Sequence, residues 1–224
     1  MKVKILLRSY LQMFFQNFLY LTSLFTIIAF GLMAGHLLNI SELKKYSLLL
    51  ISIFLLSLLS TMNLYYNDSK RNIYLKQKVN SYWADVLSQF LVALITNTFS
   101  AVLIFIFSLI LNQDLLLDVI GIFALFSCGM LGSAIATLFK TQWYHHSSLG
   151  QVGVLVFVYL AFSGSVIDLL NHVEFILPPL SKMIMTLQLE ASITKLLPTA
   201  IQAFLYSIIL FLVSSFFYKK SKNN

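Results

Sequence analysis

The chain has 224 residues, of which 59% are hydrophobic and only 10% are charged, and it carries a net charge of +7. Soluble globular proteins are usually about 45–50% apolar and about 25% charged. The composition therefore excludes a soluble domain and predicts an integral membrane protein, and the single Cys128 excludes an internal disulfide.

Charged residues divide the sequence into segments, and six charge-free segments contain 18 or more residues. About 20 apolar residues cross the hydrocarbon core as a helix, so we expect an all-α polytopic membrane protein with six transmembrane helices in a single transmembrane domain, 1–224. The expected spans are 18–38, 46–64, 89–111, 119–139, 150–166 and 196–217.

The positions of Lys and Arg predict the orientation in the membrane, since these residues favour the cytoplasmic side. With the N-terminus inside, the inner segments hold eleven of the 15 Lys and Arg, and the outer segments hold six of the eight acidic residues. We expect a multi-pass protein of a bacterial cell membrane with both termini cytoplasmic. The positive charge is then a topology signal, and we expect no nucleic-acid partner.

Residues 1–16 have an amphipathic pattern. The apolar side holds Val3, Leu6 or Leu7, Tyr10, Phe14 and Phe15, and the polar side holds Lys4, Arg8, Gln12 and Gln16. This pattern predicts an interfacial helix that leads into the first span. A simple inward extension of that span is the alternative.

The segment 65–88 is the only substantial polar segment between long hydrophobic runs. It has no Gly or Pro, and Leu75, Val79, Tyr82 and Val86 repeat at helical spacing. We expect a short amphipathic helix along the membrane surface, with its basic face toward water, lipid headgroups or another protein.

Two further segments have distinctive compositions. The outer segment 168–195 is largely apolar but contains Pro178 and Pro179 and too many charges to span, so we expect two short helices that dip into the outer leaflet. In the fourth span, small residues form one face that favours close helix packing over a ligand role. These residues are Gly121, Cys128, Gly129, Gly132, Ser133 and Ala136.

Several kinds of chemistry are missing from the sequence. The cores of the expected spans contain no Asp, Glu, Lys or Arg, which argues against ion-coupled transport. Ser163 precedes a Gly but has no His on a later span to activate it, and His145 and His146 have no neighbouring acid or Cys to complete a metal site. No phosphate-binding Gly-x-x-x-x-Gly-Lys-Ser/Thr motif occurs, so any ATP must bind to a separate subunit.

The order and lengths of these parts resemble the ABC-2-type membrane subunits of ATP-binding-cassette exporters. The resemblance covers a basic interfacial helix, a long loop after the second span, and an apolar outer insertion that reads "FSGSVIDLLNHVEFILPPLSKMI". In the loop, Asp68, Arg71, Ser81, Trp83 and Gln89 match the family's pattern, whereas its Gly and Glu are absent.

The resemblance implies a cytoplasmic coupling helix within 65–88 that binds an ATP-binding subunit, which would carry ATP and Mg on the partner and leave this chain without a cofactor. The implied contacts are Asp68, Lys70, Arg71, Tyr74, Lys76, Lys78 and Trp83. The implied outer gate is formed by Gly164, Asp168, Pro178 and Pro179, and the interfacial helix presents Lys4, Arg8 and Tyr10. A second permease subunit, as a homodimer or heterodimer, and membrane lipid are the other implied partners.

We therefore expect a non-enzymatic permease subunit that exports a hydrophobic or amphipathic substrate, such as a peptide or a lipid-like molecule. The alternative is a membrane immunity or receptor-like protein that binds a peptide toxin and transports nothing. A membrane enzyme is a third possibility.

Overall fold

The computed structural model describes residues 2–37, 42–111, 115–142, 147–165, 177–189 and 195–223. Over these ranges the chain forms nine α-helices and no strand. The helices are α1 Lys2–Phe15, α2 Phe18–Leu37, α3 Glu42–Arg71, α4 Ile73–Val79, α5 Tyr82–Leu111, α6 Leu115–Gln142, α7 Ser147–Ser163, α8 Leu180–Gln188 and α9 Leu196–Asn223.

Four of these helices, α3, α5, α6 and α9, contain segments long and apolar enough to cross a membrane. The pair Lys2–Phe15 and Tyr20–Gly31, bent by 59°, adds a fifth if it counts as one span, whereas the apolar segment Leu149–Ser163 of α7 is shorter. An all-helical membrane protein is therefore confirmed, with four or five helices of spanning length among the described residues.

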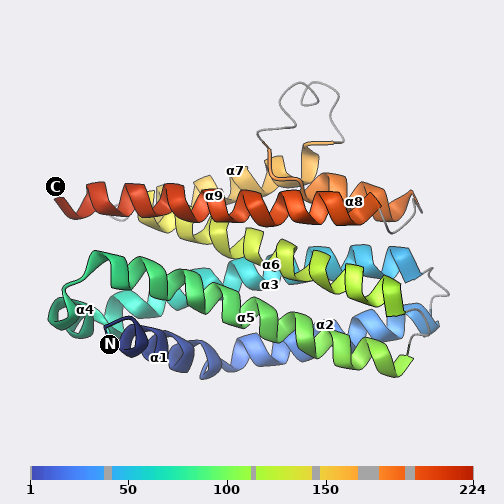
Figure 1. Cartoon of the computed structure of the whole chain (residues 1–224), viewed down its shortest axis with the longest axis horizontal. Coiled ribbons are helices and arrows are strands. Elements are labelled where there is room, and N and C mark those ends of the chain that lie inside the picture. Colours follow the sequence, from blue (N-terminus) through green and yellow to red (C-terminus); the bar gives the residue numbers. More distant parts are fainter. Residues whose placement is uncertain are drawn as a thin grey trace.

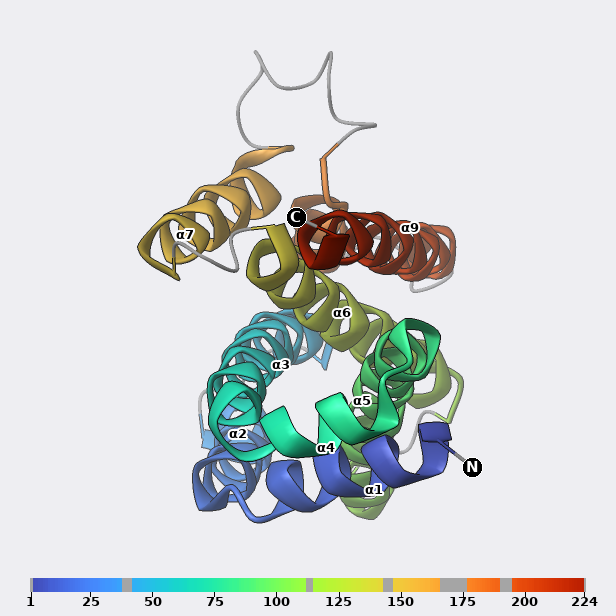
Figure 2. The same cartoon turned by 90° about the vertical axis from the view of Figure 1, so that its left-hand side faces the viewer.

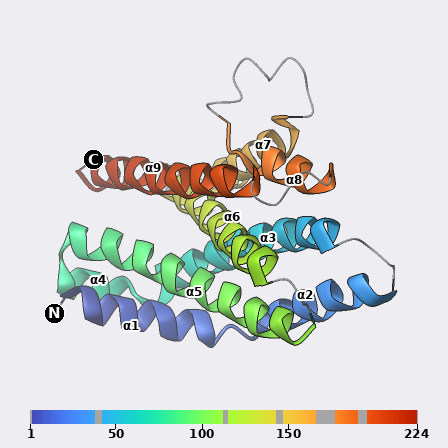
Figure 3. The ribbon, with the colours of Figure 1, turned by 45° about the vertical axis from the view of Figure 1, so that its right-hand side comes forward.

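The long helices run roughly along one axis of the molecule (Figure 1). The start of α1, the short α4 and the end of α9 lie together at one end, called here the α4 end, and α8 lies toward the other (Figures 1 and 3). Viewed from the α4 end, α6 crosses the centre, with α3 and α5 on one side of it and α7 and α9 on the other (Figure 2).

The small residues of α6 allow this central position. A Cβ atom built on Gly132 would lie 2.6 Å from the backbone oxygen of Phe54 in α3, and one on Gly129 would lie 2.4 Å from Oδ1 of Asn97 in α5. Even a methyl group on Gly132 would therefore push α6 away from α3, because a backbone oxygen cannot move aside as the end of a side chain can. The packing interpretation of the small-residue face is confirmed.

Helix α1 presents the face that its sequence predicts. Leu6, Tyr10 and Phe14 are buried, whereas Lys4 and Arg8 are exposed. This helix packs against α3, α4 and α5 at the α4 end.

The segment 65–88 differs from the expected single amphipathic helix. Helix α3 continues to Arg71, α4 covers only Ile73–Val79, and α5 begins at Tyr82. Between the last two, Asn80 adopts the left-handed conformation, with φ 38° and ψ 48°, which Asn tolerates better than most residues. The expected repeat is thus broken after Val79, and α4 lies across the end of the bundle (Figure 2).

Candidate functional site

The α4 end contains a buried cluster of charged and polar side chains around Asp85, near the start of α5. The hydroxyl of Tyr10 donates to Oδ1 of Asp85 at 2.6 Å, and the hydroxyl of Tyr218 donates to Oδ2 at 2.7 Å. The ammonium of Lys76 lies 3.4 Å from Oδ2. One carboxylate of α5 thus accepts contacts from α1, α4 and α9.

Lys76 also joins this carboxylate to a second one. Its ammonium lies 2.5 Å from Oδ2 of Asp68, on the last turns of α3, and 5.6 Å from the centre of the Tyr10 ring. The side chain of Asp68 is only 2% exposed and that of Lys76 27% exposed. We call Tyr10, Asp68, Lys76, Asp85 and Tyr218 the Asp85 cluster.

The charge of Lys76 is maintained by its neighbours. Burial lowers its pKa, but the nearby carboxylates of Asp85 and Asp68 raise it by more, so the pKa lies above its usual value. Lys76 therefore carries a positive charge at neutral pH, and the cluster holds an ammonium between two carboxylates.

Hydrogen bonds extend the cluster to the junction of α3 and α4. Asn72, between these helices, donates from its amide to Oδ1 of Asp68 at 3.1 Å and accepts from the hydroxyl of Ser9 at 2.8 Å. The short α4 is therefore attached to α1 and α3 as well as to α5, although it has only seven residues.

Polar side chains also continue from the cluster into the bundle. The hydroxyl of Tyr65 donates to Gln89 at 3.3 Å and pairs with that of Thr137 at 2.8 Å. Further along, the amide of Asn97 donates to Ser133 at 3.0 Å. These bonds join α3, α5 and α6, and such interhelical hydrogen bonds are the usual role of amides and hydroxyls inside spans.

The residues expected to contact an ATP-binding subunit divide into two groups. Asp68 and Lys76 point into the Asp85 cluster, whereas Tyr74 and Trp83 are 81% and 73% exposed, and Lys78 is exposed on α4. Lys70 and Arg71 lie on the last turn of α3, where the structure describes the backbone alone. Their role as partner contacts stays a prediction.

The residues expected at the outer gate lie toward the opposite end. Gly164 follows α7, and its neighbour Ser165 donates its backbone N–H to the hydroxyl of Ser181 on α8 at 3.1 Å. Pro178 and Pro179 are buried just before α8, so three of the four gate residues gather where α7 meets α8. Asp168 lies outside the described residues, as do His145 and His146.

Asp85 and Tyr218 are site residues that were not predicted from the sequence. Asp85 begins a polar stripe on α5 that continues through Gln89, and Asp68 ends a similar stripe on α3 that contains Thr61 and Tyr65. Polar residues at helical spacing on two successive spans indicate that these faces meet. Nothing in the spacing indicated that Tyr218, at the far end of the chain, joins them.

Chemically, the cluster is suited to holding helices together. Within the described ranges, no group of three or more His, Cys, Asp and Glu side chains is placed to hold a metal ion. No protein-family model, curated protein or solved structure matches the chain. Functional inference therefore depends on the arrangement of the chain itself.

Proposed function

We propose that the chain is the membrane-spanning subunit of an ATP-driven exporter of the ABC-2 type. In this proposal α2, α3, α5, α6, α7 and α9 are the six spans, and α4 binds a cytoplasmic ATP-binding subunit. The substrate would be a hydrophobic or amphipathic molecule, because the span cores carry no charged residue to bind an ion.

The observation that carries the proposal is the attachment of α4. A short helix with an exposed outer surface lies across the end of the bundle, and Lys76 connects its inner surface to carboxylates on α3 and α5. Tyr10 and Tyr218 bring α1 and α9 to the same carboxylate. A displacement of α4 would therefore move four other helices together.

The distribution of charge supports the cytoplasmic placement of α4. The chain termini and α4 lie at the same end (Figure 1), and this end carries most of the Lys and Arg, including the exposed Lys4, Arg8 and Lys78. Positive residues favour the cytoplasmic side. An even number of spans also returns the chain to the side on which it began.

The proposed mechanism follows from these contacts. Closure of two ATP-binding subunits would push α4 toward the membrane, and the Asp85 cluster would pass this movement to α3, α5, α1 and α9. Together with a second permease subunit, the moving helices would open a path whose outer end is closed where Gly164 and Ser165 meet α8.

The proposal is tested by co-expression with an ATP-binding subunit encoded beside this chain. We expect a stable complex with ATPase activity, and we expect Arg71→Glu with Lys78→Glu to abolish the complex or its substrate-dependent activity. The matched control, Lys182→Glu with Lys195→Glu, makes the same change of charge at the other end and should leave both intact.

Two results would overturn the proposal. One is the absence of any complex with the wild-type chain, and the other is an equal effect of the two double reversals. Either result would favour a membrane protein that binds a toxin without transporting it.

A further inference from the structure

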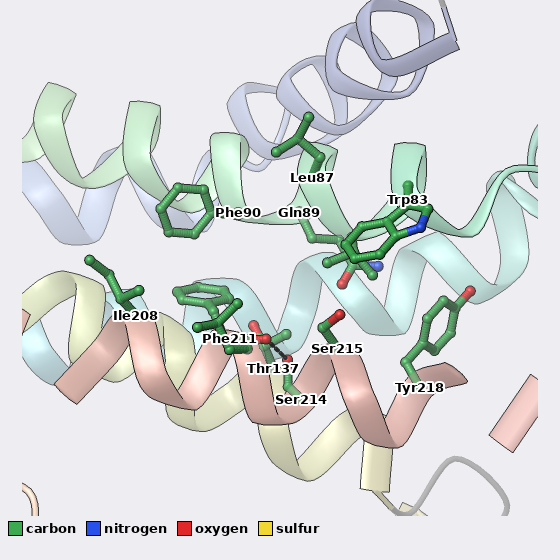
Figure 4. A pocket seen from close by; sticks show the side chains of 12 residues that line it. Trp83, Leu87, Gln89, Phe90, Thr137, Ile208, Phe211, Ser214, Ser215 and Tyr218 are labelled. Carbon is green, nitrogen blue, oxygen red and sulfur yellow. Dashed lines mark hydrogen bonds between the residues drawn. The ribbon is translucent and has the colours of Figure 1, made fainter. Parts of the chain in front are cut away.

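A groove of about 230 Å³ lies between α5 and α9 near the α4 end (Figure 4). Phe90 and Leu87 line it from α5, Ile208 and Phe211 line it from α9, and Thr137 of α6 lies beneath. The rings of Phe90 and Phe211 meet edge to face, with their centres 5.3 Å apart. The walls of the groove are therefore mainly apolar.

The groove opens on the outer surface of the bundle. Two of its lining residues, Leu87 and Leu212, are 48% and 66% exposed. Both α5 and α9 contain segments of spanning length. In a bilayer, a surface between two such helices lies at the depth of the lipid acyl chains.

The α4 end of the groove is polar and aromatic. Trp83 and Tyr218 line it there, and Tyr218 stacks on Tyr82 with ring centres 5.7 Å apart. The hydroxyl of Tyr82 in turn pairs with that of Ser215 at 2.6 Å. Trp and Tyr gather at the level of lipid headgroups, which places this end of the groove at the membrane interface.

We propose that this groove binds one acyl chain of an anionic membrane phospholipid, in the leaflet at the α4 end. The apolar walls would hold the chain, and the headgroup would lie beside Trp83 and Tyr218. The sequence continues from Tyr218 with Lys219, Lys220 and Lys222, and Lys residues near a membrane surface attract anionic lipids. The proposal is independent of the exporter function.

The chemistry of the groove favours a phospholipid over a helix of a second copy. Its walls are apolar along Phe90 and Phe211, and only its α4 end carries Trp83 and Tyr218. An acyl chain with a polar headgroup has the same division into an apolar part and an interfacial part.

The test measures which lipids remain bound to the purified chain. The protein is reconstituted in bilayers of equal phosphatidylglycerol and phosphatidylcholine, extracted in detergent, and analysed by native mass spectrometry. We expect one phospholipid per chain, enriched in phosphatidylglycerol. The variant Val86→Phe with Ile208→Phe fills the groove from both walls, and we expect about tenfold less retained lipid, as when two methylenes can no longer be buried.

A matched control makes the same substitutions on the same helices away from the groove. Val102→Phe with Ile201→Phe alters exposed positions and should retain lipid as the wild type does. The proposal is overturned if the wild type retains no lipid, if it retains both lipids equally, or if the two variants lose lipid to the same extent. If the filled variant does not fold, the wild-type measurement decides alone.

Discussion

The substitution Lys76→Gln is the strongest test of the Asp85 cluster. It removes the ammonium that contacts the carboxylates of both Asp68 and Asp85. The side chains of Asp68 and Asp85 are 2% and 6% exposed, so neither carboxylate gains full hydration when the cation is lost. Removing one partner of a fully buried ion pair costs about 3–5 kcal/mol, and an exposed pair contributes only about 0–1 kcal/mol.

Lys76 lies between these limits but closer to the buried one, with 27% of its side chain exposed. We therefore expect the substitution to lower the free energy of unfolding by about 3 kcal/mol at pH 7. The measurement is unfolding in mixed detergent and dodecyl sulfate micelles, followed by circular dichroism. Lys78→Gln, two residues along the same helix but exposed, should change the free energy by less than about 0.5 kcal/mol.

The size of the loss distinguishes a buried ion cluster from an exposed ion pair. A loss below about 0.5 kcal/mol at pH 7, equal to that of Lys78→Gln, would refute the buried ion cluster.

Three further predictions follow from the same contacts and packing. Because the pKa of Lys76 is raised in the folded state, the stability that its charge provides is complete below the ordinary lysine pKa of about 10.4 and is lost as the pH rises through the folded pKa. The free energy of unfolding of the wild type should therefore fall only above about pH 10.4. Tyr218→Phe removes a hydrogen bond to a carboxylate and should cost about 1.5–3 kcal/mol in micelle unfolding, whereas Tyr74→Phe, on a side chain that is 81% exposed, should cost almost nothing. Gly132→Ala forces a methyl group to 2.6 Å from a backbone oxygen of α3 and should lower the thermal midpoint, with an expected cost of about 1–3 kcal/mol. The control Gly31→Ala meets only the flexible end of a leucine side chain, and an equal loss there would contradict the packing argument.

The positions of the helices were largely predictable from sequence. Each charge-free run of 18 or more residues overlaps a helix, because an apolar segment of that length has few alternatives in a membrane. The buried face of α1 was also predictable, since the spacing of Tyr10 and Phe14 places them on one side of a helix.

The details of the segment 65–88 were not predictable from the same patterns. A helix break at Asn80 depends on one left-handed residue, which neither Gly nor Pro marks in the sequence. Lys76 was assigned to a basic face toward water or a partner, but it turns inward because two carboxylates from other helices lie within 4 Å. Contacts between residues far apart in the chain, such as Tyr10 and Tyr218 with Asp85, leave no periodic signal.

The number of spans also depends on more than apolar length. Helix α2 follows α1 at a bend, and α7 has only 17 residues, about 26 Å of helix against a hydrocarbon core of about 30 Å. Counting them as spans therefore relies on the alternation of direction along the chain and on the position of α4 and the termini at one end.

The most direct measurement of the central claim is the accessibility of α4 with and without an ATP-binding subunit. Tyr74→Cys places a thiol on its exposed surface, and the native Cys128 is fully buried, so a membrane-impermeant maleimide should label the new thiol alone. We expect rapid labelling of the isolated chain and strong protection in the complex, while Leu189→Cys at the opposite end should label equally in both. Equal labelling of Tyr74→Cys with and without the subunit would contradict the assignment of α4 as the coupling helix.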